Sequence, residues 1–153
     1  MKEIELMPAT HPFFNGISKE FIPDLAIHAS VVTFEAGDLL FKEGDEADKL
    51  YLIINGNVAI RSAVSNNDAI TIQTVENGEI LGWSWITAPY KYKFSARALS
   101  QTEAIVLNGE GVRAECRMDP QLGYEVMTFM VRAVSARLEQ TRVQLLNHYA
   151  KNN

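Results

Sequence analysis

The residues from Gly78 to Ala98, GEILGWSWITAPYKYKFSARA, have the types and spacing needed to hold a small anion. A glycine at position 82 lets the backbone approach a ligand closely or adopt a dihedral angle closed to other residues. Backbone amides exposed at such a turn, followed by cations, are a common anion site. The cations here are Lys91, Lys93 and Arg97. An alternative to an anion site stays open: the stretch could be a strand, a tight turn and a second strand with a solvated charged edge.

Two tryptophans stand on either side of Ser84 in this stretch. Buried tryptophans are common, and one of a closely spaced pair is most simply part of the core. We assign Trp85 to the core. Trp83 stays open between stacking on a ligand and filling the space that a ligand would need.

Length and composition are those of one ordinary globular domain spanning residues 1–153, with 47% hydrophobic and 22% charged residues. The single cysteine, Cys116, excludes an internal disulfide and a cysteine-based zinc site. Such cysteine usage is typical of the reducing cytoplasm, where we expect the protein to be located. We interpret Cys116 as a half-buried packing residue.

Charge and hydropathy argue against two classes of partner. The formal net charge is −5, whereas a domain that grips duplex DNA usually shows a basic face. No apolar run approaches the roughly 20 residues that a membrane-spanning helix needs. The charged N-terminus, MKEIELMPATH, lacks the apolar core of a signal peptide. We therefore expect neither direct DNA binding nor membrane insertion.

The middle of the chain, about residues 30–108, reads as a series of short strands. β-Branched and aromatic residues alternate with polar ones between turn residues, and Asn55-Gly56 is a strong hairpin signal. About eight strands at this spacing predict a sandwich, jelly roll or barrel. Before them, apolar residues at helical spacing predict an N-terminal helix with Ser18 as its N-cap, and Pro23 should either kink this helix or mark a restart.

The chain after the strands, about residues 109–150, has a helical period. Asn108 is expected to cap a short helix from Gly109 to Arg117, and Asp119-Pro120 to start a long one. The long helix runs for roughly 28 residues, about 40 Å. Its apolar stripe favours a coiled-coil-like homodimer over a helix lying across the barrel of a monomer. The stripe consists of Tyr124, Met127, Val131, Val134, Leu138, Thr141, Leu145 and His148.

Three motifs resemble those of the cyclic-nucleotide-binding domain, the effector domain of catabolite activator protein and its relatives. They are FEAGDLLFKEGD at residues 34–45, DKLYLI at residues 48–53 followed by Gly56-Asn57-Val58, and the Gly78-Glu79, Gly82 and Arg97-Ala98 positions. The resemblance covers about residues 14–150. It implies a mainly β fold, an eight-stranded β-roll with flanking helices, and a long C-terminal helix that often forms the dimer interface.

The resemblance also implies a ligand site whose two polar anchors have changed. In the family, a glutamate accepts a hydrogen bond from the ribose, and Trp83 takes its place here. The family also has an arginine that neutralises the phosphate and a hydroxyl residue after it, and these positions are Tyr92 and Lys93 here. On the long helix, the positions that lie over the purine match Thr141 and Arg142. The candidate ligand-binding residues are therefore Gly82, Trp83, Ser84, Lys91, Tyr92, Lys93, Arg97, Thr141 and Arg142.

These replacements weaken the case for cyclic AMP. Losing one charge-assisted hydrogen bond removes about 1.5–3 kcal/mol, roughly 10–100-fold in affinity. Three outcomes stay open: another small anionic ligand bound by the aromatic and basic residues, weak cyclic-nucleotide binding through a lysine, or a ligand-free dimerisation scaffold with the pocket filled by Trp83. Stacking on a base contributes roughly 1–3 kcal/mol, which is comparable to the loss.

No residue pattern predicts catalysis or a metal site. The three histidines lack metal-ligand spacing, and residues 31–107 contain none, whereas a cupin-like barrel enzyme needs two close together. Transcription factors of the resembled family carry a winged helix-turn-helix after the long helix, where this chain ends at Asn153. We therefore expect a sensor or regulatory domain that acts through its dimer geometry or an unknown protein partner.

Overall fold

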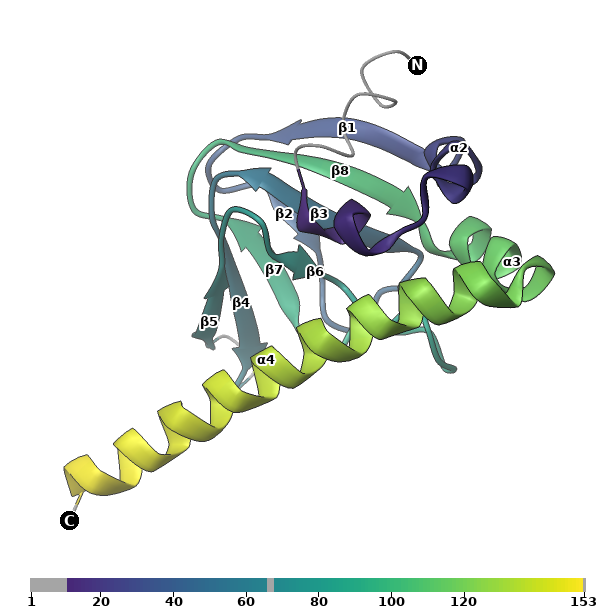
Figure 1. Ribbon diagram of the computed structural model, residues 1–153. Coiled ribbons are helices and arrows are strands. Elements are labelled where there is room, and N and C mark those ends of the chain that lie inside the picture. Colours follow the sequence, from purple (N-terminus) through teal and green to yellow (C-terminus); the bar gives the residue numbers. More distant parts are fainter. Residues whose placement is uncertain (1–10, 66–67, 153) are drawn as a thin grey trace.

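The strands form two four-stranded antiparallel sheets in the computed structural model, which describes residues 11–65 and 68–152 (Figure 1). The strand orders are β1-β8-β3-β6 and β2-β7-β4-β5. The strands are β1 (Ala29–Phe34), β2 (Leu39–Phe41), β3 (Lys49–Asn55), β4 (Val58–Ala63), β5 (Ala69–Val75), β6 (Ile80–Leu81), β7 (Ser95–Ala98) and β8 (Thr102–Asn108). The helical segments are η2 (Pro12–Gly16), η3 (Lys19–Phe21), α2 (Ile22–Ala26), α3 (Gly109–Met118) and α4 (Pro120–Asn152). This arrangement confirms the predicted β-roll with flanking helices.

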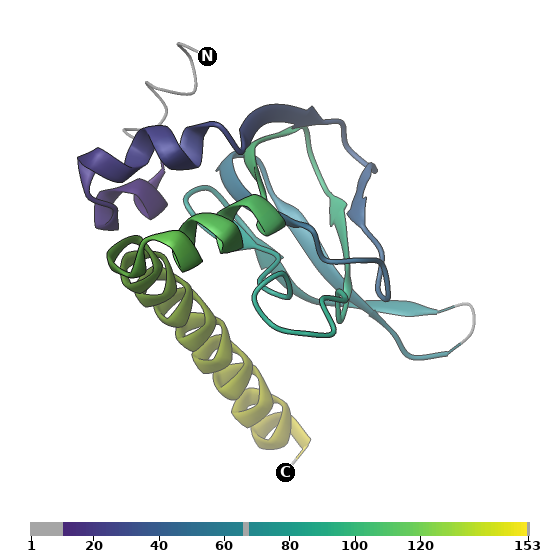
Figure 2. The ribbon, with the colours of Figure 1, turned by 90° about the vertical axis from the view of Figure 1, so that its right-hand side faces the viewer.

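In the sheet β1-β8-β3-β6, the central strands β3 and β8 are covered on both faces. Along β3, Leu50 and Leu52 contact the cluster beneath the helices, while Tyr51 and Ile53 point into the roll. Strand β8 alternates in the same way, and its Ile105 pairs with Leu52. Successive side chains of a strand point to opposite faces, so a strand covered on both sides must be apolar throughout. Its outer face is covered by α3, α4 and the N-terminal helical segments, which Figure 2 shows together on one side of the strands.

The turn that connects β3 of one sheet to β4 of the other requires its glycine. Gly56 has a φ of 118°, and a Cβ atom there would lie 2.4 Å from Thr102 Oγ1. No L side chain fits such a backbone without strain. The turn at Asn55-Gly56 is therefore confirmed, but the predicted hairpin is wrong, because β3 pairs with β6 and β8 while β4 pairs with β5 and β7.

The prediction of one N-terminal helix capped by Ser18 was wrong, whereas the predicted restart at Pro23 is confirmed. The segment consists of the 3₁₀ turns η2 and η3 followed by the short helix α2. Ser18 makes no capping hydrogen bond with its side chain, because its N–H and its hydroxyl both donate to the Glu125 carboxylate, at 2.6 and 2.7 Å. Pro23 lies in the first turn of α2, where its missing N–H is not needed.

The two C-terminal helices begin where the sequence predicts. The Asn108 side chain accepts a hydrogen bond from Gly111 N, and the Asp119 carboxylate accepts one from Gln121 N at 3.0 Å. Helix α4 is longer than predicted, at 33 residues, or about 50 Å. Its last turns, beyond the contacts of Thr141 and Gln144 with β5, project past the strands (Figure 1). Tyr124, Val131, Leu138 and Leu145, spaced by seven residues, are all exposed.

His11 predicts a pH dependence of stability. It is 2% exposed, its Nε2 lies 3.1 Å from the Glu79 carbonyl oxygen, and its Nδ1 accepts from Phe13 N. Burial lowers its pKa below the ordinary 6.5. The unfolded chain therefore binds this proton more readily, so the free energy of unfolding should fall as pH drops through about 6.5. Urea unfolding at about pH 7.5 and about pH 5.5 measures this, and His11→Gln should show a smaller difference. An equal difference in both proteins would contradict the role of His11.

Candidate functional site

The segment after β6 leaves the sheet β1-β8-β3-β6 through Gly82 and enters the other sheet at β7. Gly82 has a φ of 87°, and a Cβ atom there would lie 3.0 Å from the Lys49 carbonyl oxygen. The following loop is tied to the turn after β2, since Gly44 N donates to Tyr92 O and Tyr92 N to Asp45 O. The loop contains a cis Ala88-Pro89 peptide bond. This stretch, residues 82–93, is called the cassette loop below.

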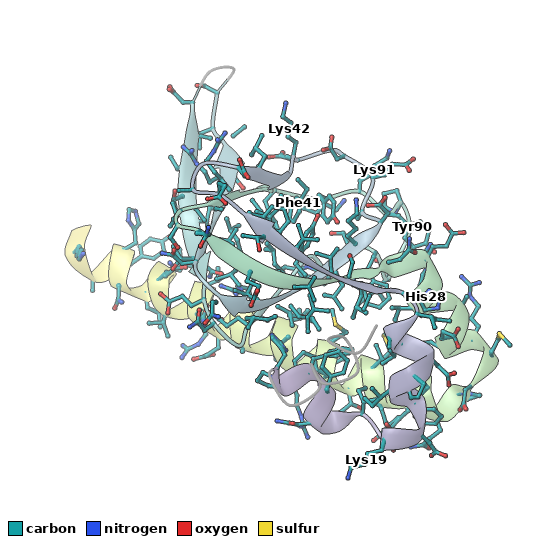
Figure 3. All side chains as sticks on the ribbon, turned by 90° about the horizontal axis from the view of Figure 1, so that it is seen from above. Lys19, His28, Phe41, Lys42, Tyr90 and Lys91 are labelled. Atoms are coloured by element: carbon teal, nitrogen blue, oxygen red, sulfur yellow. The ribbon has the colours of Figure 1, made fainter. Side chains whose placement is uncertain are left out.

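Tyr92 fills the interior of the roll behind the cassette loop. Its side chain is 3% exposed and its ring stacks on Phe41 with centroids 3.7 Å apart. Its hydroxyl donates to the Lys49 carbonyl oxygen at 2.9 Å, and burial raises the pKa of the phenol. Figure 3 shows Phe41 among the side chains between the sheets. The position that the resemblance assigns to a phosphate-binding cation is thus held by a neutral, buried ring.

The two tryptophans differ in environment. Trp85 is fully buried, which confirms its assignment to the core. Its carbonyl oxygen accepts from Arg113 of α3, whose guanidinium lies 4.2 Å from the centroid of the Tyr90 ring. Trp83 is half-buried, packs on the cluster beneath the helices and contacts Phe94 with ring centroids 5.5 Å apart. The ring that occupies the roll interior is therefore that of Tyr92, whereas Trp83, which the sequence left open, packs on the other cluster.

The three cations of the stretch have separate surroundings. Lys91 is exposed, at the periphery in Figure 3, and its Nζ lies 3.8 Å from Glu46 Oε1. Lys93 is also exposed. Arg97 Nη1 donates to the Gly37 carbonyl oxygen at 2.6 Å, and Ser84 is half-buried. The interior behind the cassette loop receives no charge from these contacts, and the predicted roles of these residues in anion binding stay predictions.

The long helix meets the roll at β5. Gln73, a buried residue of β5, donates to Thr141 Oγ1 at 2.8 Å and accepts from Arg137 Nη1 at 2.9 Å. Arg137 also lies 3.4 Å from Glu79, while Arg142 is exposed and bonds Glu139. Thr141 therefore has a protein partner already, and its predicted ligand contact stays a prediction. Sequence periodicity did not single out Gln73, because one buried amide in an otherwise alternating strand resembles a surface residue.

A cavity of about 640 Å³ lies outside the roll, between η2, residues 78–83 and α4. A more open cleft of about 500 Å³ lies farther along α4, against β5. Among the described residues, no group of three or more histidine, cysteine, aspartate and glutamate side chains could hold a metal ion. Across those same residues, no helix combines the length and apolarity needed to cross a membrane.

Comparison with known proteins identifies relatives over most of the chain. The family model described as cyclic nucleotide-binding domain matches residues 31–119, more than half of the chain. A solved structure of a putative cyclic nucleotide-binding protein from Geobacter metallireducens is 30% identical, with a TM-score of 0.79, over 90% of this chain and 99% of that one. Its near-complete coverage means that the two chains share the helices as well as the strands.

Two curated relatives are longer than this chain. The anaerobic regulatory protein of Bacillus subtilis is 30% identical over 60% of this chain and 39% of its own length. The CRP-like cAMP-activated global transcriptional regulator of Mycobacterium tuberculosis is 24% identical over 86% of this chain and 57% of its own. The chain thus spans about half the length of these relatives.

Proposed function

The chain belongs to the cyclic nucleotide-binding domain family, and we propose that it is a non-catalytic regulatory domain that dimerises through α4 and holds no cyclic nucleotide in the usual family manner. The observation that carries this proposal is the buried ring of Tyr92 stacked on Phe41. The domain then keeps the family's architecture while the interior behind its cassette loop is part of the hydrophobic core.

The free energy that Tyr92 would lose also argues against binding of a cyclic nucleotide in the family's usual way. A phosphate behind the cassette loop requires Tyr92 to leave the core and lose both its ring stacking and its bond to Lys49. Removing a large aromatic ring from a core costs about 3–5 kcal/mol. A micromolar ligand binds with only about 8.2 kcal/mol, so this cost alone weakens binding by more than about 100-fold. The ribose acceptor is also missing, because Trp83 offers only a donor.

The exposed stripe of α4 supports the dimer. Tyr124, Val131, Leu138 and Leu145 present an apolar seam with a seven-residue repeat to solvent. Such a seam is buried when two helices pair in a coiled coil. The curated relatives are named as regulators. The net charge of −5 favours a protein partner over DNA for this chain, which we place in the cytoplasm.

Titration with cyclic AMP, cyclic GMP and a panel of nucleotides and inorganic phosphate tests the ligand part. Melting temperature and tryptophan fluorescence are followed, because a ligand at 100 times its dissociation constant stabilises by about 2.7 kcal/mol. We expect no saturable change with either cyclic nucleotide. The Mycobacterium tuberculosis relative, which is named as cAMP-activated, is the positive control.

A matched variant of this chain shows whether the changed side chains account for the result. It combines Trp83→Glu, Tyr92→Arg and Lys93→Ser, the residues that the resemblance implies, and should gain cyclic-nucleotide binding where the natural chain has none. Stabilisation of the natural chain by micromolar cyclic AMP would overturn the proposal. Binding of another anion that is lost in Lys91→Gln and Lys93→Gln would instead favour an anion sensor that uses the exposed lysines.

A further inference from the structure

The cavity outside the roll has the size and the walls of a small-molecule site. Its volume of about 640 Å³ lies within the usual range of roughly 300–1,000 Å³ for such sites. Trp83, Tyr124 and Phe129 supply aromatic surface, and Ile80 and Ala133 add aliphatic surface. No lining residue comes from β4, β5 or β7, so this cavity is separate from the roll interior that Tyr92 occupies.

Two acidic side chains line the cavity, and both already have partners. Glu79 lies 3.4 Å from Arg137. Glu125 accepts from the Gln121 side chain, from Ser18 N and from Ser18 Oγ, and these bonds lower the pKa of its carboxyl. A cationic ligand would have to take a carboxylate away from these donors.

One cationic residue that lines the cavity is available to bind a ligand. Arg132 of α4 is exposed and makes no ion pair or hydrogen bond with any residue that the structure describes. Its guanidinium is a planar fork of donors that matches a carboxylate. An anion at this wall therefore gains a charge-assisted bond without breaking one that the protein already makes.

We propose that this cavity binds an organic monocarboxylate with an apolar body, the carboxylate held by Arg132 and the body packed against Trp83 and Phe129. The ligand would touch η2, the turn before β6 and α4 together. Because it contacts three segments, its occupancy would favour the arrangement of α4 that this structure shows over any arrangement that opens the cavity.

The test is calorimetric titration of the full chain with three probes. 4-Phenylbutyrate and decanoate carry the same charge on an aromatic and an aliphatic body, and 4-phenylbutylamine carries the opposite charge on the aromatic body. We expect at least one carboxylate to bind saturably and to change the tryptophan emission, since Trp83 lines the cavity. The amine should not bind. Comparison of the two carboxylates distinguishes an aromatic from an aliphatic ligand.

Three variants locate the binding. Arg132→Gln should weaken carboxylate binding by about 10-fold or more, the loss of one charge-assisted bond. Ala136→Trp fills the cavity from an exposed position of α4 and should abolish binding. Arg117→Gln, the same chemical change on the exposed surface of α3, should leave it unaltered.

Three results would overturn this proposal: no binding of either carboxylate, equal binding of the amine, or equal affinity of the Arg132→Gln and Arg117→Gln variants. Circular dichroism of each variant shows that it is folded. Arg132 and Ala136 belong to neither the apolar seam of α4 nor the roll interior. Tyr124 belongs to both the cavity wall and the seam, so the variants avoid it: loss of carboxylate binding in Arg132→Gln does not bear on the dimer, and loss of the dimer in Leu138→Glu does not bear on the cavity.

Discussion

Leu138→Glu is expected to convert the protein from a dimer into a folded monomer. Leu138 is 68% exposed in the single chain, so it contributes little to the packing of its own domain. In a two-fold seam each substitution acts twice, because the same position contributes from both helices. Burying a leucine is worth about 1.5–3 kcal/mol, so the pair loses about 3–6 kcal/mol. Dimerisation should weaken by about 100- to 10,000-fold, before repulsion between the two carboxylates is added.

Light scattering after size-exclusion chromatography measures the mass of the particle. Ala136→Glu places the same charge on an exposed position of α4 outside the seam, and this control should remain dimeric. Both variants should keep the melting behaviour of a folded domain. A natural chain that is monomeric, or a Leu138→Glu variant that stays dimeric, would rule out this interface.

Tyr92→Leu is expected to lower the free energy of unfolding by about 3 kcal/mol or more, because it removes the ring stacked on Phe41. For a chain of this size, that corresponds to a fall of about 6–12 °C in melting temperature. Tyr92→Phe keeps the ring and loses only the hydrogen bond to the Lys49 carbonyl oxygen. It should cost about 1 kcal/mol.

Urea unfolding of the two Tyr92 variants separates the contribution of the ring from that of the hydroxyl. Tyr149→Leu is the matched control, since Tyr149 is exposed near the end of α4 and should have little effect on folding of the domain. A Tyr92→Leu variant within about 1 kcal/mol of the natural chain would mean that this ring does not hold the interior closed. The proposal on cyclic nucleotides would then lose its support.

Local sequence patterns were enough to predict most of the secondary structure. The strand pattern changes to a helical period after residue 108, and the capping residues Asn108 and Asp119 lie within three positions of the amides they bind. The positive φ of Gly56 in the turn after β3 is likewise a local requirement. These features depend on neighbours along the chain, so the amino-acid order alone predicts them.

The N-terminal helical segment shows where local patterns fail. A serine followed by apolar residues at helical spacing predicts a capped helix, but Ser18 bonds to Glu125, 107 residues away. That carboxylate comes into reach only when α4 packs against the N-terminal segment. The competition between a local cap and a distant partner is therefore settled by tertiary packing.

The order of residues was enough to locate the cassette loop and to show that its two polar anchors have changed. It could not say which ring enters the roll, because the direction of each side chain depends on the loop's backbone angles and on where Phe41 of β2 lies. The cavity lined by Arg132 is formed by η2, the turn before β6 and α4. Its charge balance depends on which carboxylates find partners after those segments pack together, so it exists only in the folded chain.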